Sequence, residues 1–297
     1  MLMLALLLTS LSVRVPQTAA QAVPPDYQAV LAALGKTGDF KDGVLKVNLP
    51  RPDLSVTIAG RPAPTPFGFG GWVALSKGTG GMDVLMGDLV LTEDEVNPVM
   101  SAVLDQGLDV TALHNHFFWE QPRVFYMHVH GMGTAAALAR QLQPAVALID
   151  RAVRRAQPGG APAPLQLNTD ALAKIVGQAG EANGAVYKIT IGRPDIDMRV
   201  DGARVNARMG LNTWAAFTGT DADAMVAGDV AMLEAEVPAV LRALRSRGID
   251  IVAMHHHMTD AKPTVIFLHY FGRGRADALA GAVRGALDAI GPKGARR

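Results

Sequence analysis

The 297-residue chain contains no cysteine, which excludes disulfide bonds, thiolate metal sites and cysteine nucleophiles. It also lacks an excess of either charge, because 28 Lys and Arg stand against 27 Asp and Glu. Aromatic residues are few, and no run of Lys and Arg is interleaved with them. Nucleic acid and anionic membrane surfaces are therefore not expected as partners. The length and the 49% of hydrophobic residues fit a well-packed globular protein of about two domains.

The first 22 residues have the layout of a secretory signal peptide. Residues 1–11 are almost wholly apolar, and Ala20 and Ala22 are the small residues expected before a cleavage site. The apolar stretch is too short to span a bilayer comfortably. No Lys or Arg precedes it, and the alternative interpretation is an uncleaved anchor or a mis-chosen start. The sequence thus predicts an exported protein of the periplasm or cell envelope.

The remainder of the chain contains an internal duplication. At an offset of 142 (193 − 51) the matches are Arg51 with Arg193, Gly60 with Gly202 and Trp72 with Trp214. At an offset of 141 (228 − 87) they are Gly87-Asp88 with Gly228-Asp229, Gly107 with Gly248, Asp109 with Asp250, Pro122 with Pro263 and Gly131 with Gly272. We therefore predict an N-terminal repeat at 23–150 and a C-terminal repeat at 166–297. Between them, residues 151–165 include a Pro/Gly-rich stretch that is typical of a linker.

Each repeat mixes strands and helices. In the first, the pattern predicts helices at 26–34, 92–107 and 134–150, and strands at 44–49, 54–59, 71–76, 82–91, 109–118 and 123–130. Thr92 and Glu95 have the spacing of a capping box, and Gly107 is a typical helix stop. The order favours an α+β fold with two homologous lobes, each a mainly antiparallel sheet with helices packed on one face.

All eight histidines fall in two short windows, one in each repeat. The windows contain His114, His116, His128 and His130, and then His255, His256, His257 and His269. Three pairs share the offset of 141 (255 − 114, 257 − 116 and 269 − 128). Alternate residues of a strand face the same side, about 6.6 Å apart. Two imidazoles with this spacing can converge on one metal ion, with a further ligand from a neighbouring strand.

The histidines therefore predict a transition-metal site, with hydrogen-bonded core histidines as the alternative. We assign a primary site in the N-terminal repeat to His114, His116, His128 and His130. A related site contains His255, His257 and His269, and is either degenerate or part of a composite site between the lobes. His256 is expected to point away, because its counterpart is Asn115. Imidazole ligands and an exported location without thiols favour copper, with zinc as the alternative.

After the predicted signal peptide, the chain resembles the LppY/LpqO family, exported bacterial proteins that share a domain of no known function. The resemblance rests on Leu113-His114-Asn115-His116-Phe117, on Phe125-Tyr126-Met127-His128-Val129-His130-Gly131, and on the equivalent residues between Met254 and Gly272. It implies a cell-envelope location, often as a lipoprotein, and no established reaction. The absence of cysteine departs from the lipoprotein pattern.

A shorter segment, His128-Val129-His130-Gly131-Met132-Gly133, resembles the strand motif of copper superoxide dismutases, in which two histidines bind the metal. This resemblance implies an oxidoreductase that acts on superoxide, although the rest of the chain does not resemble that enzyme's β-barrel. A basic side chain near the site would steer such an anion. Arg123 is our candidate for this catalytic role, with Lys262 in the second repeat.

Two further classes of function stay open. One is a zinc-dependent hydrolase in which Glu120, four residues after His116, is the general base. The other is a non-catalytic metal carrier, or an interaction module with cell-envelope protein partners. Asp88 and Asp229 are candidates for orienting a histidine ring. Trp72 and Trp214 are interpreted as core residues.

Overall fold

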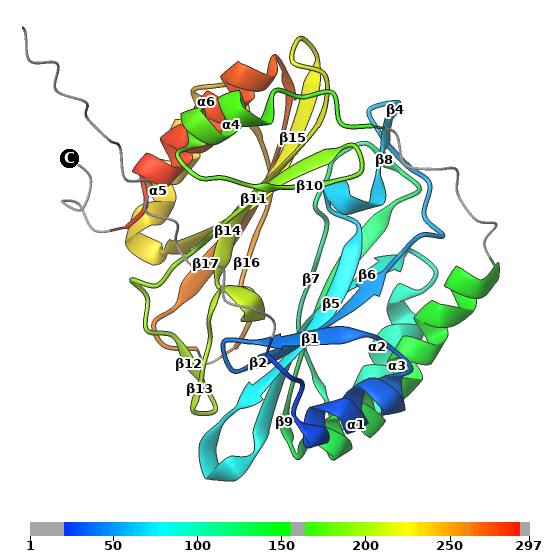
Figure 1. Cartoon of the computed structure of the whole chain (residues 1–297). Coiled ribbons are helices and arrows are strands. Elements are labelled where there is room, and N and C mark those ends of the chain that lie inside the picture. Colours follow the sequence, from blue (N-terminus) through cyan, green and yellow to red (C-terminus); the bar gives the residue numbers. More distant parts are fainter. Residues whose placement is uncertain (1–20, 156–163, 260, 292–297) are drawn as a thin grey trace, which may run out of the picture.

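The structure is a computed structural model, and it describes residues 21–155, 164–259 and 261–291. The predicted signal peptide lies almost entirely outside the described residues, and so does most of the predicted linker. Figure 1 shows two α+β halves, the first coloured blue to green and the second green to red. Among the helices that the structure describes, none has the length and apolar character that crossing a membrane requires.

The first repeat contains a six-stranded antiparallel sheet. In sheet order its strands are β1 (Gly38–Lys41), β2 (Val44–Pro50), β5 (Gly70–Lys77), β6 (Asp83–Thr92), β9 (Val124–Gly133) and β7 (Asp109–His114). Its helices are α1 (Pro25–Leu34), α2 (Val96–Asp105) and α3 (Ala135–Arg155). A smaller sheet is formed by β4 (Arg61–Ala63), β3 (Val56–Ile58) and β8 (Glu120–Gln121), and the short 3-10 helices are η1 (Thr65–Phe67) and η2 (Thr79–Gly81).

The second repeat has the same strand order. Its antiparallel sheet consists of β10 (Glu181–Asn183), β11 (Val186–Gly192), β14 (Asn212–Gly219), β15 (Ala224–Leu233), β17 (Val265–Gly274) and β16 (Asp250–His255). Its other elements are α4 (Thr169–Val176), α5 (Val237–Arg245), α6 (Ala276–Asp288), the two-stranded sheet of β12 (Arg199–Val200) and β13 (Ala203–Arg204), η3 (Ala207–Met209) and η4 (Glu234–Glu236). The predicted duplication and the mixed α+β architecture are therefore confirmed.

The predicted helix boundaries have visible local causes. Thr134 accepts a hydrogen bond from the backbone N–H of Ala137 at 3.3 Å and so caps α3. The Glu95 carboxylate accepts one from the backbone N–H of Thr92 at 2.8 Å, although α2 itself begins only at Val96. Gly107, at φ 74°, supplies the left-handed conformation just after that helix ends.

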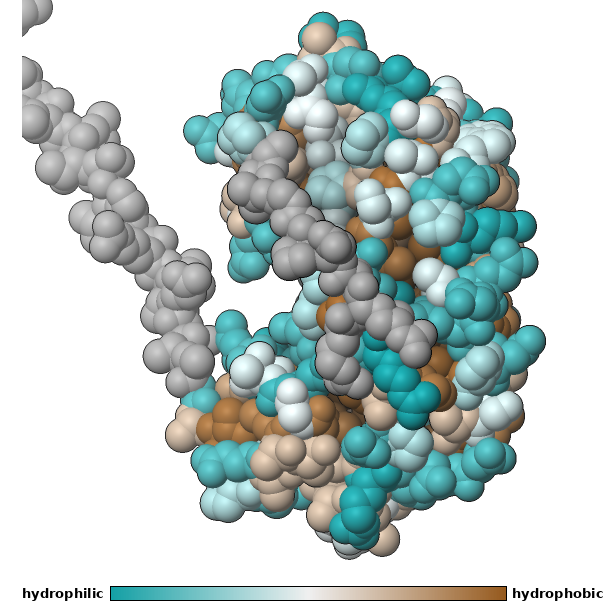
Figure 2. Space-filling view, turned by 90° about the vertical axis from the view of Figure 1, so that its right-hand side faces the viewer, coloured by the Kyte–Doolittle hydropathy of each residue, from teal (hydrophilic) through white to brown (hydrophobic). Residues whose placement is uncertain are grey.

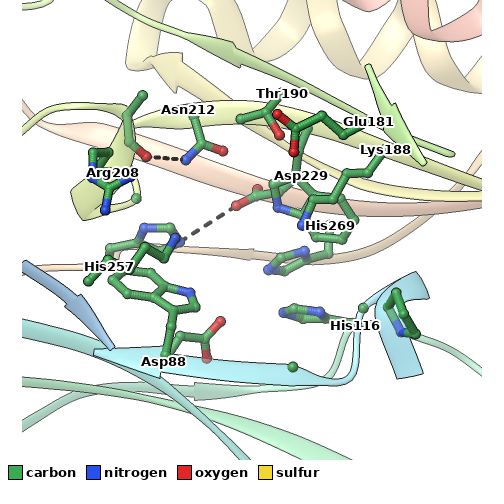
Figure 3. Close-up of a pocket in the computed structure, with 18 of the residues that line it drawn as sticks. Asp88, His116, Glu181, Lys188, Thr190, Arg208, Asn212, Asp229, His257 and His269 are labelled. Atoms are coloured by element: carbon green, nitrogen blue, oxygen red, sulfur yellow. Dashed lines mark hydrogen bonds and ion pairs between the residues drawn. The ribbon is translucent and has the colours of Figure 1, made fainter. Parts of the chain in front are cut away.

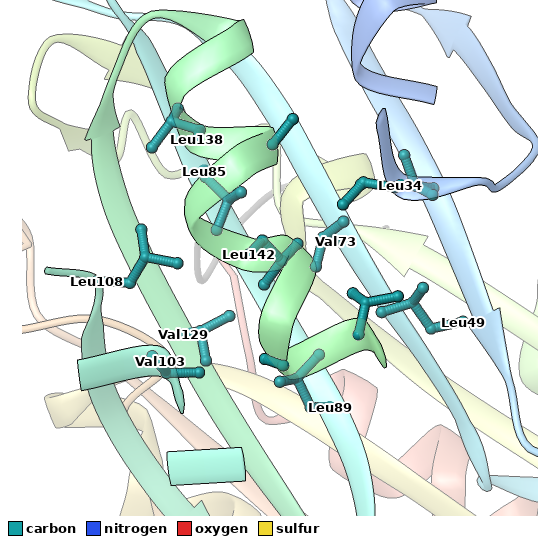
Figure 4. Packing of buried hydrophobic residues seen from close by; sticks show 14 of the residues in the cluster. Leu34, Leu49, Val73, Leu85, Leu89, Val103, Leu108, Val129, Leu138 and Leu142 are labelled. Carbon is teal, nitrogen blue, oxygen red and sulfur yellow. The ribbon is translucent and has the colours of Figure 1, made fainter. Parts of the chain in front are cut away.

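Each repeat has its own apolar core. In the first, side chains of α1, α2 and α3 form one buried cluster with alternate residues of β2, β5, β6 and β9. Leu138 and Leu142 of α3 lie over Val73, Leu85 and Val129 of the sheet (Figure 4). The second repeat has an equivalent cluster built from α4, α5 and α6.

Two further apolar clusters join the repeats to each other. One includes Val44, Ala74 and Met86 of the first repeat together with Met198 and other residues of the second. The other packs Phe117 and Tyr126 among apolar residues of β11, β14, β15 and β17. These clusters use the opposite strand positions from the helix-facing cores. The two sheets therefore meet through their inner faces. Figure 2 shows the body hollowed on one side between its upper and lower parts.

The duplicated Arg-Pro-Asp segment has a structural role. Arg51 is 1% exposed, and its guanidinium pairs with Asp53 at 2.6 Å and with Glu95 at 2.8 Å. It also donates to the Val90 carbonyl at 2.6 Å. Arg193 makes the equivalent set of bonds in the second repeat. Arg51 thus connects the β2–β3 turn to the start of α2, and Arg193 connects the β11–β12 turn to the start of α5.

Candidate metal centre

Equivalent strands place one carboxylate and one imidazole side by side in each repeat. In the first sheet Asp88 on β6 lies opposite His128 on β9. In the second, Asp229 on β15 lies opposite His269 on β17. A β-bulge in β7, between Val110 and Ala112, is repeated at the matching position of β16. It precedes the histidines at the ends of these two strands.

The inner faces bring histidines of both repeats into one cluster, which we call the histidine cluster. Its members are His114, His116, His128, His255, His257 and His269. The rings of His114 and His255 lie only 3.7 Å apart between centroids. His116 lies 3.7 Å from His269, and the equivalent pair of His257 and His128 is separated by 4.2 Å. The cluster therefore has an approximate twofold symmetry that relates the two repeats.

Two groups within this cluster have ligand nitrogens close enough to share one ion. One group is His114, His128 and His255, and the other is His114, His116 and His269. In each group the nitrogens all lie within 4.8 Å of one another. The Nε2 atoms of His114 and His128 are 3.0 Å apart. Two imidazole nitrogens on one tetrahedral ion, each at 2.0–2.1 Å from it, would be separated by about 3.3 Å.

Backbone carbonyl groups orient several of the rings. His269 Nδ1 lies 3.3 Å from the carbonyl oxygen of Gly228, and His128 has the equivalent hydrogen bond to the Gly87 backbone. His114 Nδ1 lies 3.3 Å from the Asn115 carbonyl oxygen. A ring that donates through Nδ1 presents Nε2 with a free lone pair, which is the form a metal requires.

Several ring nitrogens of the cluster are buried without a hydrogen-bond partner among the described residues. They are both nitrogens of His116, both nitrogens of His255 and Nε2 of His269. A buried polar atom without a partner loses its hydration and gains nothing in return. Because a neutral ring has one lone-pair nitrogen and one N–H, a bound cation would satisfy one nitrogen of each of these rings.

The environment keeps the cluster neutral. Burial lowers the pKa of His114 to about 2, and the pKa values of His257 and His269 to about 3. Burial and the neighbouring imidazoles also lower the pKa values of the other three rings. At neutral pH the six imidazoles are therefore unprotonated and able to bind a metal.

Asp88 and Asp229 lie beside the cluster, and both are buried. Burial raises the pKa of each carboxyl group, and for Asp88 the neighbouring Asp229 raises it further. A carboxylate oxygen of Asp229 lies 3.6 Å from His257 Nε2, and one oxygen of each aspartate has no hydrogen-bond partner among the described residues. These carboxylates can orient a ring or bind the ion directly.

The structure agrees with the composite site between the lobes, one of the two arrangements that the sequence left open, and not with a separate primary site. Six of the seven assigned ligands come together, but in one cluster shared by both repeats rather than in a primary and a related site. His130 lies apart from it: its Nδ1 is 3.5 Å from Asp109 and its Nε2 is 3.0 Å from Asp201 of the other repeat. His256 is exposed and also lies outside the cluster.

Arg123 and Glu120 lie near the part of the histidine cluster that contains His114. Both line a cavity of about 450 Å³ that also reaches His114. Arg123 is exposed, and its Nε is 4.0 Å from the carboxylate of the buried Glu120. Burial raises the pKa of Glu120. Lys262 lines a separate cavity together with His256.

A larger cavity, of about 540 Å³, opens between the repeats and reaches His116, His257 and His269. Figure 3 shows these rings with Asp88 and Asp229 at one end of the cavity. Trp72 and Trp214 pack against the apolar clusters between the repeats, as residues interpreted as core would, and they also line the walls of this cavity. The lining of the cavity also includes four basic residues that we did not single out, Lys41, Lys46, Lys188 and Arg208. The sequence did contain a signal for Lys46 and Lys188, because they match at the offset of 142 (188 − 46).

The family comparison matches this duplicated architecture. The model of a family described as Domain of Unknown Function (DUF1259) matches residues 28–148 and again residues 170–289. The chain belongs to this family. It contains two copies of the DUF1259 domain, and the histidine cluster lies where the two copies meet. No curated protein matches the chain.

Three solved structures are similar over much of the chain but only weakly. The fused permuted hexameric shell protein MSM0275 from the RMM microcompartment is 15% identical, with 72% of this chain and 85% of that chain covered and a TM-score of 0.18. EtuB from Clostridium kluyveri is 10% identical over 86% and 89%, with a TM-score of 0.20. The trimeric bacterial microcompartment shell protein PduB is 12% identical over 83% and 86%, also at 0.20. With TM-scores this low, none of these likenesses informs the function.

Proposed function

We propose that this protein is an exported metalloprotein that holds one copper ion in the histidine cluster and uses it for redox chemistry, with superoxide as the first substrate to test. The observation that carries the proposal is the convergence of six neutral imidazoles from two repeats, several with unpartnered buried nitrogens. We also propose that the family extends to the LppY/LpqO proteins, on the motif around His114 and His128.

The stoichiometry follows from the ligand groups. Both groups that could hold an ion include His114. This ring uses Nδ1 toward the Asn115 carbonyl group, which leaves Nε2 for a single ion. We therefore expect one ion per chain, with ligands from both repeats.

Helix packing supports a site between the sheets. We infer that the helices of each repeat cover the outer sheet face and leave the inner face for the other repeat. The apolar clusters of α1–α3 and of α4–α6 support this inference. A site enclosed by two inner faces is shielded from water, which keeps the imidazoles neutral.

Copper is favoured over other ions by the donor set. Nitrogen donors without sulfur suit copper(II), zinc, nickel and iron, and copper(II) binds most tightly at equal geometry. Copper would supply a reversible one-electron couple. In superoxide disproportionation one superoxide is oxidised to O₂, and a second takes up two protons and is reduced to H₂O₂. The support for this chemistry is the donor set rather than the His-Val-His motif, because His130 lies outside the cluster.

A zinc-dependent hydrolase is the second candidate. Glu120 lines the same cavity as His114, and burial raises the pKa of its carboxyl group. A general base benefits from a pKa raised toward the working pH. Against this role, Glu120 also lies within 3.4 Å of the Asn115 side-chain amide, which occupies one carboxylate oxygen.

Metal analysis of matched variants tests the proposal. Purified protein is loaded with copper or zinc, desalted, and assayed for bound metal, for the copper(II) EPR signal and for superoxide consumption. The test variants are His114→Ala, which removes the ring that both ligand groups share, and the double variant His116→Ala/His128→Ala, which removes one ligand from each group. The matched controls are His130→Ala and His256→Ala. We expect about one equivalent of copper in the wild type and in both controls, with loss of metal and activity in the test variants.

Other outcomes separate the alternatives. Zinc without redox activity, together with a hydrolytic activity that Glu120→Gln abolishes, would favour the hydrolase. Tight copper binding without turnover would leave a metal carrier. Full metal content in both test variants would contradict the site assignment.

A further inference from the structure

The cavity between the repeats carries basic groups that the metal proposal does not use. Lys46 on β2 and Lys188 on β11 occupy equivalent positions of the two sheets, and both are half-buried. Each ammonium group lies over the indole ring of its own repeat. The distance is 4.6 Å for Lys46 over Trp72 and 4.2 Å for Lys188 over Trp214.

Neither lysine has a carboxylate within 4.0 Å among the described residues. The acidic residues that line the same cavity are Asp88, Asp229 and Glu181. Asp88 attracts both ammonium groups and Asp229 attracts that of Lys188, but from beyond ion-pair distance. Lys46 is in turn repelled by Lys188 and Arg208. Burial, together with this repulsion, lowers the pKa of Lys46 to about 8.

Arg208 and Lys41 are the other basic residues that line the cavity. One of the guanidinium nitrogens of Arg208 pairs with Asp39 at 2.5 Å, across the repeat interface. Its Nε is buried and has no hydrogen-bond partner among the described residues. The Arg208 guanidinium lies close enough to Lys46 to lower its pKa, and a guanidinium N–H without a partner can donate to an oxyanion.

The two indoles provide an apolar wall that spans the interface. Trp72 extends to Gly210 of the second repeat: a Cβ at this glycine would lie 3.2 Å from the indole Cη2. Trp214 reaches Gly68 of the first repeat in the same way, at 3.8 Å. Gly210 has φ 95°, a conformation that also disfavours side chains. Glycine at position 210 therefore leaves room for the Trp72 ring to reach across.

The size of the cavity argues against a diatomic anion as its only occupant. Its volume of about 540 Å³ lies in the range typical of small-molecule sites. A neighbouring hollow, also of about 540 Å³, shares Lys46, Lys188 and Trp72 with it. The lysines therefore lie where the two spaces join, and a ligand at the lysines would still have His116 and His269 within the same cavity.

We propose that this cavity binds a small organic dianion, such as a dicarboxylate with an apolar body, whose two anionic groups engage Lys46 and Lys188 while its body lies against Trp72 and Trp214. Binding of this dianion is a separate property from the proposed copper function, and it does not depend on the identity of the metal. The ligand bridges the two repeats through equivalent residues. Arg208 Nε supplies an additional hydrogen bond to one anionic group.

The test uses phthalate, an aromatic dianion, with the full-length chain after removal of metal by a chelator. Binding is followed by calorimetry and by tryptophan fluorescence, because Trp72 and Trp214 report on the cavity. The neutral phthalamide tests the need for charge, and inorganic phosphate tests the need for an apolar body. We expect saturable binding of phthalate, with phthalamide and inorganic phosphate at least about tenfold weaker.

Four variants identify the site. Lys46→Met and Lys188→Met remove one charge each at similar length, and Lys174→Met is the control because Lys174 is exposed on α4, away from the cavity. We expect about tenfold weaker phthalate binding in each cavity variant and an unchanged affinity in the control. Without ligand, the two cavity variants should have a higher Tm than the wild type, because each removes a poorly compensated cation. Lys46→Arg, which restores the charge, should recover binding.

The outcomes of this test are independent of those of the copper experiment. Absence of phthalate binding, or equal affinity in the wild type and in the two cavity variants, would overturn the dianion site even where copper binds. Phthalamide or inorganic phosphate binding as tightly as phthalate would also overturn it. Phthalate binding that depends on the lysines in a chain that fails to hold copper would support this site and contradict the metal proposal.

Discussion

Metal-free protein should lose stability steeply as the pH falls from neutral toward 5. The cluster histidines have lowered pKa values in the folded chain, to about 3 for His257 and His269, whereas an unfolded histidine titrates near pH 6.5. Between about pH 6.5 and pH 3 the unfolded chain therefore binds protons that the folded chain does not. The stability that these histidines contribute is therefore fully present above pH 6.5, and it is lost as the pH falls toward 3.

The size of the effect can be worked out from the six rings. Lowering the pH from 7.0 to 5.5 costs about 1.3 kcal/mol for each histidine held neutral, or about 8 kcal/mol for the cluster. Asp88 and Asp229 act in the opposite sense, because burial raises their pKa values. They offset at most about 2 kcal/mol each over this interval. The net loss is then at least about 4 kcal/mol, a large part of the stability of an ordinary domain.

Urea unfolding followed by circular dichroism at several pH values measures this loss. His257→Gln should reduce the slope of unfolding free energy against pH by about 1.4 kcal/mol per unit below pH 6. His256→Gln, which changes an exposed histidine outside the cluster, should keep the wild-type slope. A metal-free wild type that is equally stable at pH 7.0 and 5.5 would refute the reasoning.

Three further predictions concern the fold and the limits of the site. Arg51→Met leaves two carboxylates without their buried cation and should lower the unfolding free energy by about 3–5 kcal/mol in chemical denaturation; a loss below 1 kcal/mol would contradict the structural role. Gly228→Ala places a Cβ against the Trp214 carbonyl oxygen and should cost about 3 kcal/mol. Gly281→Ala on α6 places a Cβ in open space and should leave the unfolding free energy unchanged or raise it in the same chemical denaturation experiment. His130→Ala should cost less than about 1 kcal/mol, because the aspartates it contacts are exposed, and metal analysis should show unchanged copper content.

The sequence predicted much of the local structure because the local signals are strong. The offset of 141 identified the six residues that form the cluster, although His116 lies beyond the end of β7 and is not placed by alternation along a strand. The strand predicted at 109–118 ends at His114 instead. Beyond it Asn115 bonds the Val124 carbonyl group through its side chain, so the chain leaves the sheet before the predicted end.

Alternation failed for His130 because it says which face a side chain occupies but not how far along the strand the site extends. His130 shares the inner face with His128, yet it lies opposite Met86 and Asp109, toward the far end of the sheet. The second repeat presents Asp201 there rather than an imidazole.

The joining of the two sites depends on contacts between the repeats, which no pattern within one repeat encodes. Thr111, for example, donates a hydrogen bond of 2.7 Å to the His257 carbonyl group across the interface. Lys46 and Lys188 were overlooked for a related reason. A single lysine in an apolar strand is usually solvated, and only the facing sheet turns this pair into the wall of a cavity.

Anomalous diffraction at the copper absorption edge, from crystals grown with copper(II), tests the central claim most directly. We predict one strong peak within about 2.1 Å of imidazole nitrogens from both repeats, including His114 Nε2. Absence of any peak in the cluster, or a peak bound only at His130 or His256, would contradict a metal centre at the interface of the two DUF1259 domains.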